Sequence, residues 1–426
     1  MSSAPLTLAA VGCGSRVQVY SALAAAMPDR YRVVAAADPI PDRLERVRQL
    51  SKNPGLRTFA NDRELFAAGK LADVLMIGTQ DPDHVGPCIA AMELGYDVLL
   101  EKPIATNFRE VQRLETAANR LGRRVLICHV LRYTTFYSKI KDLITAGTLG
   151  DLIAVNATEG VGLFHQAHSF VRGHWAVTER CSPMIISKSC HDLDILSWLV
   201  DAPCEAVASF GSTSYFNAAH APAGAPARCT DGCPVAATCP YDAHRYLGDQ
   251  RGWLHWVYDR DDVATDAEIK AWLATSKWGR CVYHCDNTAV DRQSVNLHFA
   301  NRVTATFTMT AFSEGREIEI RGTRGILQAG ESVRRLTGHD IAITDHATKQ
   351  VTWHDVPVLE GEFAGHWGGD RGLMDLLHAE LQRPNPADMR SSLQRSVESH
   401  AIGFAAEESR VTGRTVRLDE FRQRHR

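Results

Sequence analysis

The first third of the chain alternates short apolar runs with segments that read as helices. Apolar runs lie at residues 6–11, 31–37 and 74–78, and helical stretches include residues 18–27 and 88–94. Two further runs, at 98–100 and 123–130, continue the pattern. Successive strand–helix units predict a parallel sheet with right-handed crossovers, which is the arrangement of an α/β domain.

The pattern changes in the second half of the chain. Between residues 303 and 310 apolar side chains alternate with threonines, and isoleucines at 318 and 320 alternate with charged residues. Strict alternation predicts strands with one apolar face, as in an antiparallel sheet. We therefore expect two domains: residues 1–130 with the parallel sheet, and an α+β domain of residues 131–426 that contains an insertion at about 214–290.

Composition and charge narrow the choice of partners. The 426 residues carry a formal net charge of −3, with 45% hydrophobic and 23% charged residues, which favours neither nucleic acid nor an anionic membrane as partner. No apolar run approaches the ~20 residues that span a bilayer, and the N-terminus lacks the basic and apolar regions of a signal peptide. We expect a cytoplasmic protein that binds small molecules or other subunits.

A glycine turn follows the first apolar run directly. Gly12 permits a tight turn, and Gly14 lets a pyrophosphate approach the backbone N–H groups at the start of the next helix, where Ser15 and Arg16 lie. Val17 occupies the third position of the motif, which is usually a small residue. The turn predicts a dinucleotide-binding site.

Asp38 ends the second apolar run, about 20 residues after the glycine motif. An acid at this distance is suited to hold the ribose hydroxyls and would repel a 2′-phosphate, so we expect NAD rather than NADP. The alternative is a turn residue before Pro39, because Asp-Pro commonly starts a turn.

The run at 98–100 meets Glu101-Lys102-Pro103 with nothing between them. Pro103 lacks a backbone N–H and biases Lys102 towards an extended backbone, so the strand should end here with Lys102 at its carboxyl edge. Ligands of open parallel sheets bind at this edge. The alternative is an exposed Glu–Lys pair.

These features together resemble the Gfo/Idh/MocA family, the glucose-fructose oxidoreductase and inositol dehydrogenase group. The resemblance rests on the Gly12-x-Gly14 turn, Asp38, Pro82-x-His84 and Glu101-Lys102-Pro103. It continues at Gly147-x-Leu149-Gly150, His191, Gly322-Thr323-x-Gly325 and Gly368-Gly369-Asp370. It implies a Rossmann domain and a large, mainly antiparallel open sheet whose exposed face commonly pairs subunits, so we expect a homo-oligomer, a dimer or tetramer.

The resemblance also implies roles for individual residues. Lys102 would lie beside the nicotinamide and the substrate hydroxyl, and His191 matches the family's site histidine. Thr79, His84 and Glu101 complete the expected set around the cofactor, which is NAD.

His191 lies in a segment, residues 187–199, that reads as one helix with Ser187 or Lys188 and His191 on the same face. Family members often carry an aspartate four positions before this histidine, whereas this chain has Ser187. A serine cannot supply the carboxylate's charge, so Lys188 or another neighbour must shape the proton path.

A stretch rich in histidine and aromatic residues, 164–175, precedes this helix. Such a mixture suits a sugar, with aromatic faces on C–H surfaces and polar tips on hydroxyls. Arg172 and Lys188 could also hold a carboxylate, sulfonate or phosphate. The alternative is a solvated loop. The expected substrate-binding residues are Arg132, His165, His168, Arg172, His174, Trp175, Lys188 and His191.

The insertion contains three cysteines at intervals of four and six residues, within a chain that holds eleven. An odd number in a reducing compartment favours free thiols or a metal over disulfides. Cys229, Cys233 and Cys239, with Cys281 as fourth ligand and Cys285 in reserve, would suit a structural zinc ion. The alternative is that all remain free thiols.

The sequence leads to one preferred function and one alternative. We expect an NAD-dependent oxidoreductase that oxidises a secondary hydroxyl, at C3, of a sugar or glycoside, with Lys102 or His191 taking the proton. The alternative is an NAD-dependent glycoside hydrolase that uses transient C3 oxidation, elimination, water addition and re-reduction. His366 lies on a glycine-rich turn that either reaches the substrate side or only starts a helix.

Overall fold

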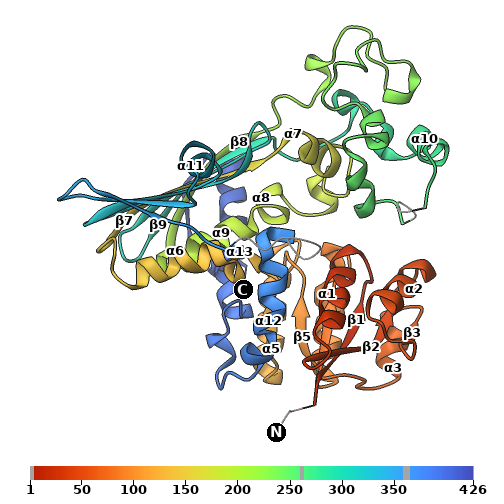
Figure 1. The fold of residues 1–426 in the computed structure, drawn as a ribbon, viewed down its shortest axis with the longest axis horizontal. Coiled ribbons are helices and arrows are strands. Elements are labelled where there is room, and N and C mark those ends of the chain that lie inside the picture. The colour runs from red at the N-terminus through yellow and green to blue at the C-terminus, as the bar shows by residue number, and fades with distance from the viewer. Residues whose placement is uncertain (1–3, 260–262, 358–364, 426) are drawn as a thin grey trace.

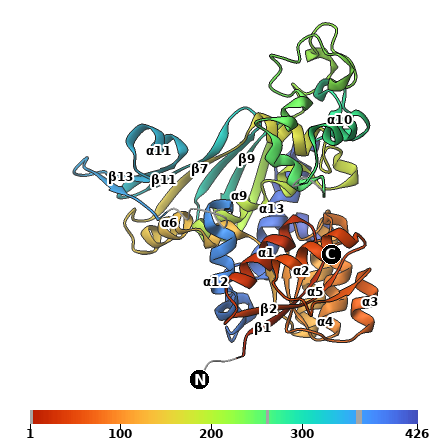
Figure 2. The same ribbon diagram turned by 45° about the vertical axis from the view of Figure 1, so that its right-hand side comes forward.

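The computed structural model describes residues 4–259, 263–357 and 365–425. Residues 1–3 lie outside these ranges. They are part of the N-terminal segment in which we expected no signal peptide. Figures 1 and 2 show a lower layer formed by the N-terminal third and an upper layer that holds a second sheet.

Six parallel strands form the first sheet, in the order β3-β2-β1-β4-β5-β6. They are β1 (Leu6–Val11), β2 (Tyr31–Ala37), β3 (Arg57–Phe59), β4 (Val74–Ile77), β5 (Asp97–Leu100) and β6 (Val125–Ile127). The helices between them are α1 (Ser15–Ala26), α2 (Pro41–Leu50), α3 (Asp62–Ala67), α4 (Val85–Glu93) and α5 (Phe108–Leu121). The expected α/β fold is confirmed. The short β3 has no clear apolar run and was not predicted.

The two faces of this sheet bury alternate residues of each strand. Leu8 and Ala10 of β1 share a core with α1, whereas Ala9 and Val11 pack on the other side with α4 and α5. A C-terminal helix, α12 (Gly369–Leu381), adds Leu373 to the first of these cores. The far end of the chain therefore completes the cover of the N-terminal sheet.

Nine strands form the second sheet, in the order β14-β13-β12-β11-β7-β10-β9-β8-β15. Their bounds are β7 (Leu152–Val161), β8 (Cys204–Ser212), β9 (Arg292–Phe299), β10 (Thr304–Thr310), β11 (Glu314–Gly322), β12 (Gly325–Gly330), β13 (Ile341–Asp345), β14 (Val351–His354) and β15 (Val416–Arg417). All neighbours pair antiparallel except β7 and β10, which are parallel. The expectation of a mainly antiparallel sheet is confirmed.

One face of the second sheet is open to solvent. Along β9 the residues alternate strictly between exposed and buried, with Ser294 and Asn296 on the exposed face. The helices of this half are α6 (Thr135–Thr145), α7 (Leu163–His165), α8 (Met184–Ser187), α9 (Cys190–Val200), α10 (Asp266–Thr275), α11 (Glu331–Thr337), α13 (Leu393–Thr412) and α14 (Leu418–Arg424). Of these, α9 and α13 pack together and α13 also packs against β8.

The expected insertion lies between the end of β8 at Ser212 and the start of β9 at Arg292. Apart from α10, its described part consists of short 3₁₀ turns and connecting loops. Figures 1 and 2 both show it, in green, projecting beyond the sheet at the top of the molecule. In the described part of the chain, no helix combines the length and apolarity needed to cross a bilayer.

Candidate active site

The glycine turn between β1 and α1 has the shape that a bound pyrophosphate requires. Gly12 has a φ of +79°, and a Cβ on it would lie 2.6 Å from the backbone nitrogen of Thr79. A Cβ on Gly14 would meet no atom within 4 Å, and no side chain caps the start of α1. The first N–H groups of α1 therefore have no side-chain cap, and Gly14 leaves room beside them, which fits a dinucleotide at this helix terminus.

Val17 does not disturb this turn, although it replaces the usual small residue. A Cβ on Gly78 would lie 2.8 Å from the Cγ2 atom of Val17, so the valine fills the space that Gly78 leaves. Gly78, directly after β4, thus provides the close helix–strand packing that a small residue at position 17 would otherwise provide.

Asp38 is buried at the end of β2 and accepts two backbone hydrogen bonds. Its carboxylate receives the N–H of Cys13 at 2.7 Å and the N–H of Ile40 at 2.8 Å. It therefore lies beside the glycine turn, where the expected ribose-binding acid belongs.

Arg16 joins the glycine turn to the C-terminal part of the chain. Its Nε donates to Glu101 at 2.8 Å, and its Nη1 donates to Asp370 of α12 at 3.1 Å. Burial raises the pKa of Glu101, but the charges of Arg16 and Lys102 outweigh burial and lower it, so Glu101 is a carboxylate. We expected Arg16 to contact the cofactor. In the structure its Nε and Nη1 instead donate to the carboxylates of Glu101 and Asp370.

Lys102 lies at the carboxyl edge of β5, as the Glu-Lys-Pro pattern predicted. Its Nζ donates to the backbone carbonyl of Ser187 at 3.0 Å. The peptide bond to Pro103 is cis, and the carbonyl of Pro103 lies 2.7 Å from Nδ1 of His84. The Nε2 of His84 lies 3.3 Å from the carbonyl of Thr79, so His84 holds the two strand ends together.

The expectation of one continuous helix over residues 187–199 is wrong. Helix α8 ends at Ser187 and α9 begins at Cys190. In an unbroken helix the carbonyl of Ser187 would accept the N–H of His191. Here it accepts the Lys102 ammonium instead, and the N–H groups of Asp192 and Leu193 both bond to Ser189.

His191 has a buried, neutral ring. Its side chain is buried, at 5% exposure, and its Nδ1 has no hydrogen-bond partner in the described structure. Burial lowers its pKa well below 6.5, and the charge of Lys102 lowers it further. The rings of His129 and His366 lie 5.8 and 5.9 Å from it, centroid to centroid. His191 is therefore unprotonated at neutral pH, the form in which a histidine can act as a general base.

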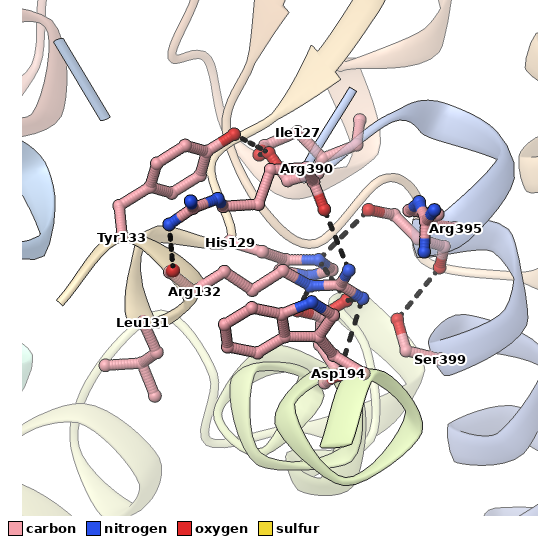
Figure 3. A network of polar contacts seen from close by, with 12 residues as sticks. Ile127, His129, Leu131, Arg132, Tyr133, Asp194, Arg390, Arg395 and Ser399 are labelled. Atoms are coloured by element: carbon pink, nitrogen blue, oxygen red, sulfur yellow. Dashed lines mark hydrogen bonds and ion pairs between the residues drawn. The ribbon is translucent and has the colours of Figure 1, made fainter. Parts of the chain in front are cut away.

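A buried network, which adjoins His191 through the ring of His129, connects α9 to the segment that follows β6 (Figure 3). Asp194 accepts from Arg132 Nε at 2.6 Å and lies 2.9 Å from His129 Nδ1. Burial would raise the pKa of Asp194, but the charge of Arg132 holds it well below the usual range. Arg132 is 1% exposed and also donates to the carbonyl of Arg390 at 2.8 Å. The structure thus places Arg132 in the interior and not on a substrate-facing surface.

A second cluster of charges surrounds Lys188. Its Nζ lies 2.8 Å from Glu159, and Arg316 bridges Glu159 at 2.8 Å and Asp192 at 2.7 Å. Lys188 is therefore balanced by a carboxylate from β7, so it is not an unpaired cation. Glu159 and Arg316 were not predicted, because they lie on β7 and β11 and meet Lys188 only in the folded chain.

The histidine-rich stretch is mainly buried, so the alternative of a solvated loop is wrong. The pKa of His165 is lowered well below 6.5 by burial and then by the charge of Lys188, which places it beside that cluster. His168 lies 2.5 Å from the hydroxyl of Tyr246, and burial lowers its pKa to about 3.

The remaining residues of the stretch have partners elsewhere. His174 contacts Lys277 at 3.4 Å, and Trp175 donates its indole N–H to Asp81 at 2.8 Å, next to the end of β4. Arg172 is 2% exposed and donates to the carbonyl of Arg280 within the insertion. Arg172 and Lys188, which from the sequence could together have bound an anionic group, thus have different surroundings.

His366 lies just before α12. The sequence left open whether it reaches the substrate side or only starts a helix. The structure brings its ring to His191, and its Nδ1 lies 3.0 Å from Asp370. Both His366 and Trp367 have positive φ, at 50° and 55°, a conformation that residues other than glycine rarely adopt. Such local strain is commonly found at functional sites.

The cysteines are all free thiols in the structure. Within the ranges that the structure covers, no three His, Cys, Asp or Glu side chains are grouped so that they could already hold a metal ion. The positions of Cys229, Cys233, Cys239 and Cys281 therefore do not by themselves support the expected zinc ion.

Two matches to one protein family span most of the chain. Residues 6–129 match "Oxidoreductase family, NAD-binding Rossmann fold", and residues 137–328 match "GFO/IDH/MocA C-terminal domain". The Bacillus subtilis protein "Putative oxidoreductase YteT" is 23% identical, over 92% of this chain and 94% of its own length. An inositol 2-dehydrogenase of Streptomyces avermitilis is 28% identical, over 58% of this chain and 78% of its own length.

Solved structures share the fold at low sequence identity. An oxidoreductase from Agrobacterium radiobacter, in complex with NAD+, L-tartaric acid and magnesium, has a TM-score of 0.70 at 15% identity and covers 97% of this chain and 99% of its own. The WlbA dehydrogenase of Bordetella pertussis, in complex with NADH and UDP-GlcNAcA, has a TM-score of 0.65 at 17% identity and covers 98% of each chain. The chain therefore belongs to the Gfo/Idh/MocA family of oxidoreductases, with an NAD-binding Rossmann fold.

Proposed function

We propose that this protein oxidises a secondary hydroxyl of a sugar or other polyol with NAD. One observation carries the proposal: the Lys102 ammonium, at the carboxyl edge of β5, neighbours the neutral His191 ring with its unpartnered Nδ1. An ammonium that donates to the substrate oxygen and a nitrogen that accepts its proton are the groups that oxidation of an alcohol needs.

Each residue has a separate task in this proposal. NAD, when bound, supplies the acceptor for the hydride. Lys102 turns from the Ser187 carbonyl to the substrate hydroxyl and fixes its orientation. The His191 ring accepts the hydroxyl proton, while Arg16 and Glu101 hold the strand end that carries Lys102.

Asp38 supports a preference for NAD over NADP. Its buried carboxylate lies against the glycine turn, where a 2′-phosphate would meet a negative charge. The ribose hydroxyls would replace one of its backbone donors or share its free lone pairs.

Known relatives and the charges of the site indicate a polyol substrate. The relatives include inositol 2-dehydrogenases, whereas two solved neighbours are in complex with the anionic ligands L-tartaric acid and UDP-GlcNAcA. Lys188 is already paired with Glu159, and Arg172 donates within the insertion. These two pairings favour a neutral polyol over the anionic sugar that Lys188 and Arg172 together would have served.

An NAD-dependent glycoside hydrolase is a second candidate function, because two further histidines, His366 and His165, lie near His191 and Lys102. His366 adjoins His191, and the charges of Lys188 and Lys102 act on His165. Elimination and water addition require an extra acid and base, which these rings would supply. In that case NAD is recycled, so product forms without net NADH.

The open face of the second sheet supports a homo-oligomer. It is lined by Ser294, Asn296 and Thr306, and it exposes 67% of Phe210. A second copy of the sheet would cover this face. Sedimentation velocity of the full chain tests the proposal, with a dimer or tetramer as the expected result and a monomer as the contrary one.

A substrate screen tests the proposed function directly. Neutral cyclitols, hexoses, uronic acids and aryl glycosides are each supplied with NAD, while NADH absorbance and products are followed. Steady NADH formation with a polyol supports the oxidoreductase, and NMR of the product identifies the carbon, expected to be C3. Release of the aryl group without NADH formation supports the hydrolase.

A further inference from the structure

Four cysteines from two parts of the insertion line one small cavity. They are Cys229, Cys233, Cys239 and Cys281. The cavity has a volume of about 10 Å³, which is room for one water molecule or one ion. Cys285 is not among the lining residues, and its thiol donates to the carbonyl of Cys281 at 3.3 Å.

The backbone holds these cysteines near one another. An isolated antiparallel bridge joins Arg228 to Arg280, and the N–H of Cys281 donates to the carbonyl of Ala227 at 2.9 Å. Cys229 and Cys281 follow this bridge on its two strands, so they are neighbours although they are far apart in sequence. Cys233 and Cys239 flank a turn in which the N–H of Cys239 donates to the carbonyl of Val235 at 3.0 Å.

A buried cation without a full set of partners also lines the cavity. Arg172 is 2% exposed, and its Nη2 donates to the carbonyl of Tyr241 at 2.6 Å and to the sulfur of Cys229 at 3.5 Å. Its Nη1 is buried and has no partner in the described structure, as is also true of Oδ2 of Asp242 on the same cavity. Burying such groups without partners costs free energy, so their position points to a missing ligand.

We propose that this cavity binds one zinc ion through the thiolates of Cys229, Cys233, Cys239 and Cys281. Zinc displaces the four thiol protons, and the resulting complex carries two negative charges. Arg172 Nη1 then donates to a coordinated sulfur and offsets part of that charge. Because the thiols do not yet form a metal-holding group, binding must draw them inward over the cavity.

Size and coordination argue for zinc and for a structural role. Four thiolates form a closed tetrahedral shell, which leaves no open position for catalysis. A cavity suited to one water-sized particle has no room for a four-iron cluster. The described part of the insertion has one α-helix, α10, and it shares two small apolar clusters with residues 164–171 and Ala311, so a metal would tie its loops together.

Metal analysis of the full-length protein tests the proposal. Protein from zinc-supplemented culture is expected to hold about one zinc per chain. Cys233→Ser and Cys239→Ser, at half-buried positions, are expected to lower zinc retention under chelator challenge at least about tenfold. Cys285→Ser, also half-buried but off the cavity, is the matched control and should retain zinc like the wild type.

A second measurement uses only the wild-type protein, so it tests the site even if the cysteine variants fail to fold. Wild-type protein grown without zinc is titrated under reducing conditions with cobalt(II), whose four-thiolate complexes have a characteristic charge-transfer absorbance. Saturation at about one cobalt per chain supports the site. Wild-type protein that takes up neither metal overturns it, as does zinc retained equally by all three variants. Iron with acid-labile sulfide in place of zinc also overturns it.

Discussion

The Nζ atom of Lys102 donates to the backbone carbonyl of Ser187, 85 positions away, at 3.0 Å. This carbonyl has no helical partner because α8 ends at Ser187 and α9 begins at Cys190, so the break lies one turn before His191. The contact joins the end of β5 to the segment that carries His191. It depends on the backbone at residue 187, so the side chain there is not what holds Lys102.

Replacement of Ser187 therefore tests whether the backbone contact is sufficient. We expect Ser187→Ala to keep turnover within about threefold of the wild type, because the Ser187 hydroxyl donates only to the carbonyl of Pro183, at 3.3 Å. Steady-state kinetics on the substrate found in the screen measures the effect. A loss of about a hundredfold would mean that the hydroxyl itself takes part in proton transfer.

Asp38 sets the preference for NAD in this account. We expect Asp38→Ala to raise KM for NAD about tenfold, because a hydrogen bond to the ribose is lost. We also expect it to reduce the preference for NAD over NADP. Initial rates with each cofactor measure both effects. Asp29→Ala, an exposed acid before β2, serves as the control. An unchanged ratio of the two cofactors in Asp38→Ala would show that Asp38 only shapes the turn.

His191 gives a prediction for pH. Burial and the charge of Lys102 lower its pKa below 6.5, so the ring stays neutral at pH 7 and gains a proton only in more acidic solution. The acid limb of kcat/KM should therefore lie well below pH 6.5. We expect His191→Asn to lower kcat by about 10²- to 10⁴-fold. An acid limb centred above pH 6.5 in the wild type would contradict the neutral ring.

Asp194 gives a prediction for stability. Asp194→Asn would leave the buried Arg132 guanidinium without its counter-charge, at a cost of about 3–5 kcal/mol in the free energy of unfolding at pH 7. Urea unfolding measures this cost. Asp201→Asn, whose carboxylate is mostly exposed beside Lys141, should cost less than about 1 kcal/mol.

The same pair predicts a pH dependence. The pKa of Asp194 is lowered in the folded state, so its stabilising effect is full above the ordinary carboxyl pKa of 3.8 and is lost as pH falls towards the folded value. The difference in stability between wild type and Asp194→Asn should thus be constant from pH 7 to about 5 and shrink below about 4. A difference that grows in acid would contradict the ion pair.

Local patterns predicted the features that depend on neighbouring residues. The apolar runs, the Gly12 turn and the stop at Pro103 follow from short-range backbone rules, so the first sheet and the place of Lys102 at its edge could be predicted. The break after Ser187 could not be predicted, because the apolar spacing of residues 187–199 is helical and a distant lysine takes the carbonyl.

The charge partners could not be predicted for the same reason. Arg16 reaches Asp370 across 354 positions, and Arg132 reaches Asp194 across 62. Periodicity shows which face of an element is buried but does not show which buried charges meet. Arg132 was thus expected at the substrate, although its guanidinium is held in the interior.

The central claim is that Lys102 acts on the substrate hydroxyl, and one comparison tests it most directly. NADH formation by Lys102→Met is measured against wild type on the polyol that the screen identifies, with NAD affinity measured separately by calorimetry. We predict NAD binding within about tenfold of the wild type and a fall in kcat of at least about a hundredfold. Wild-type turnover in Lys102→Met would contradict the account.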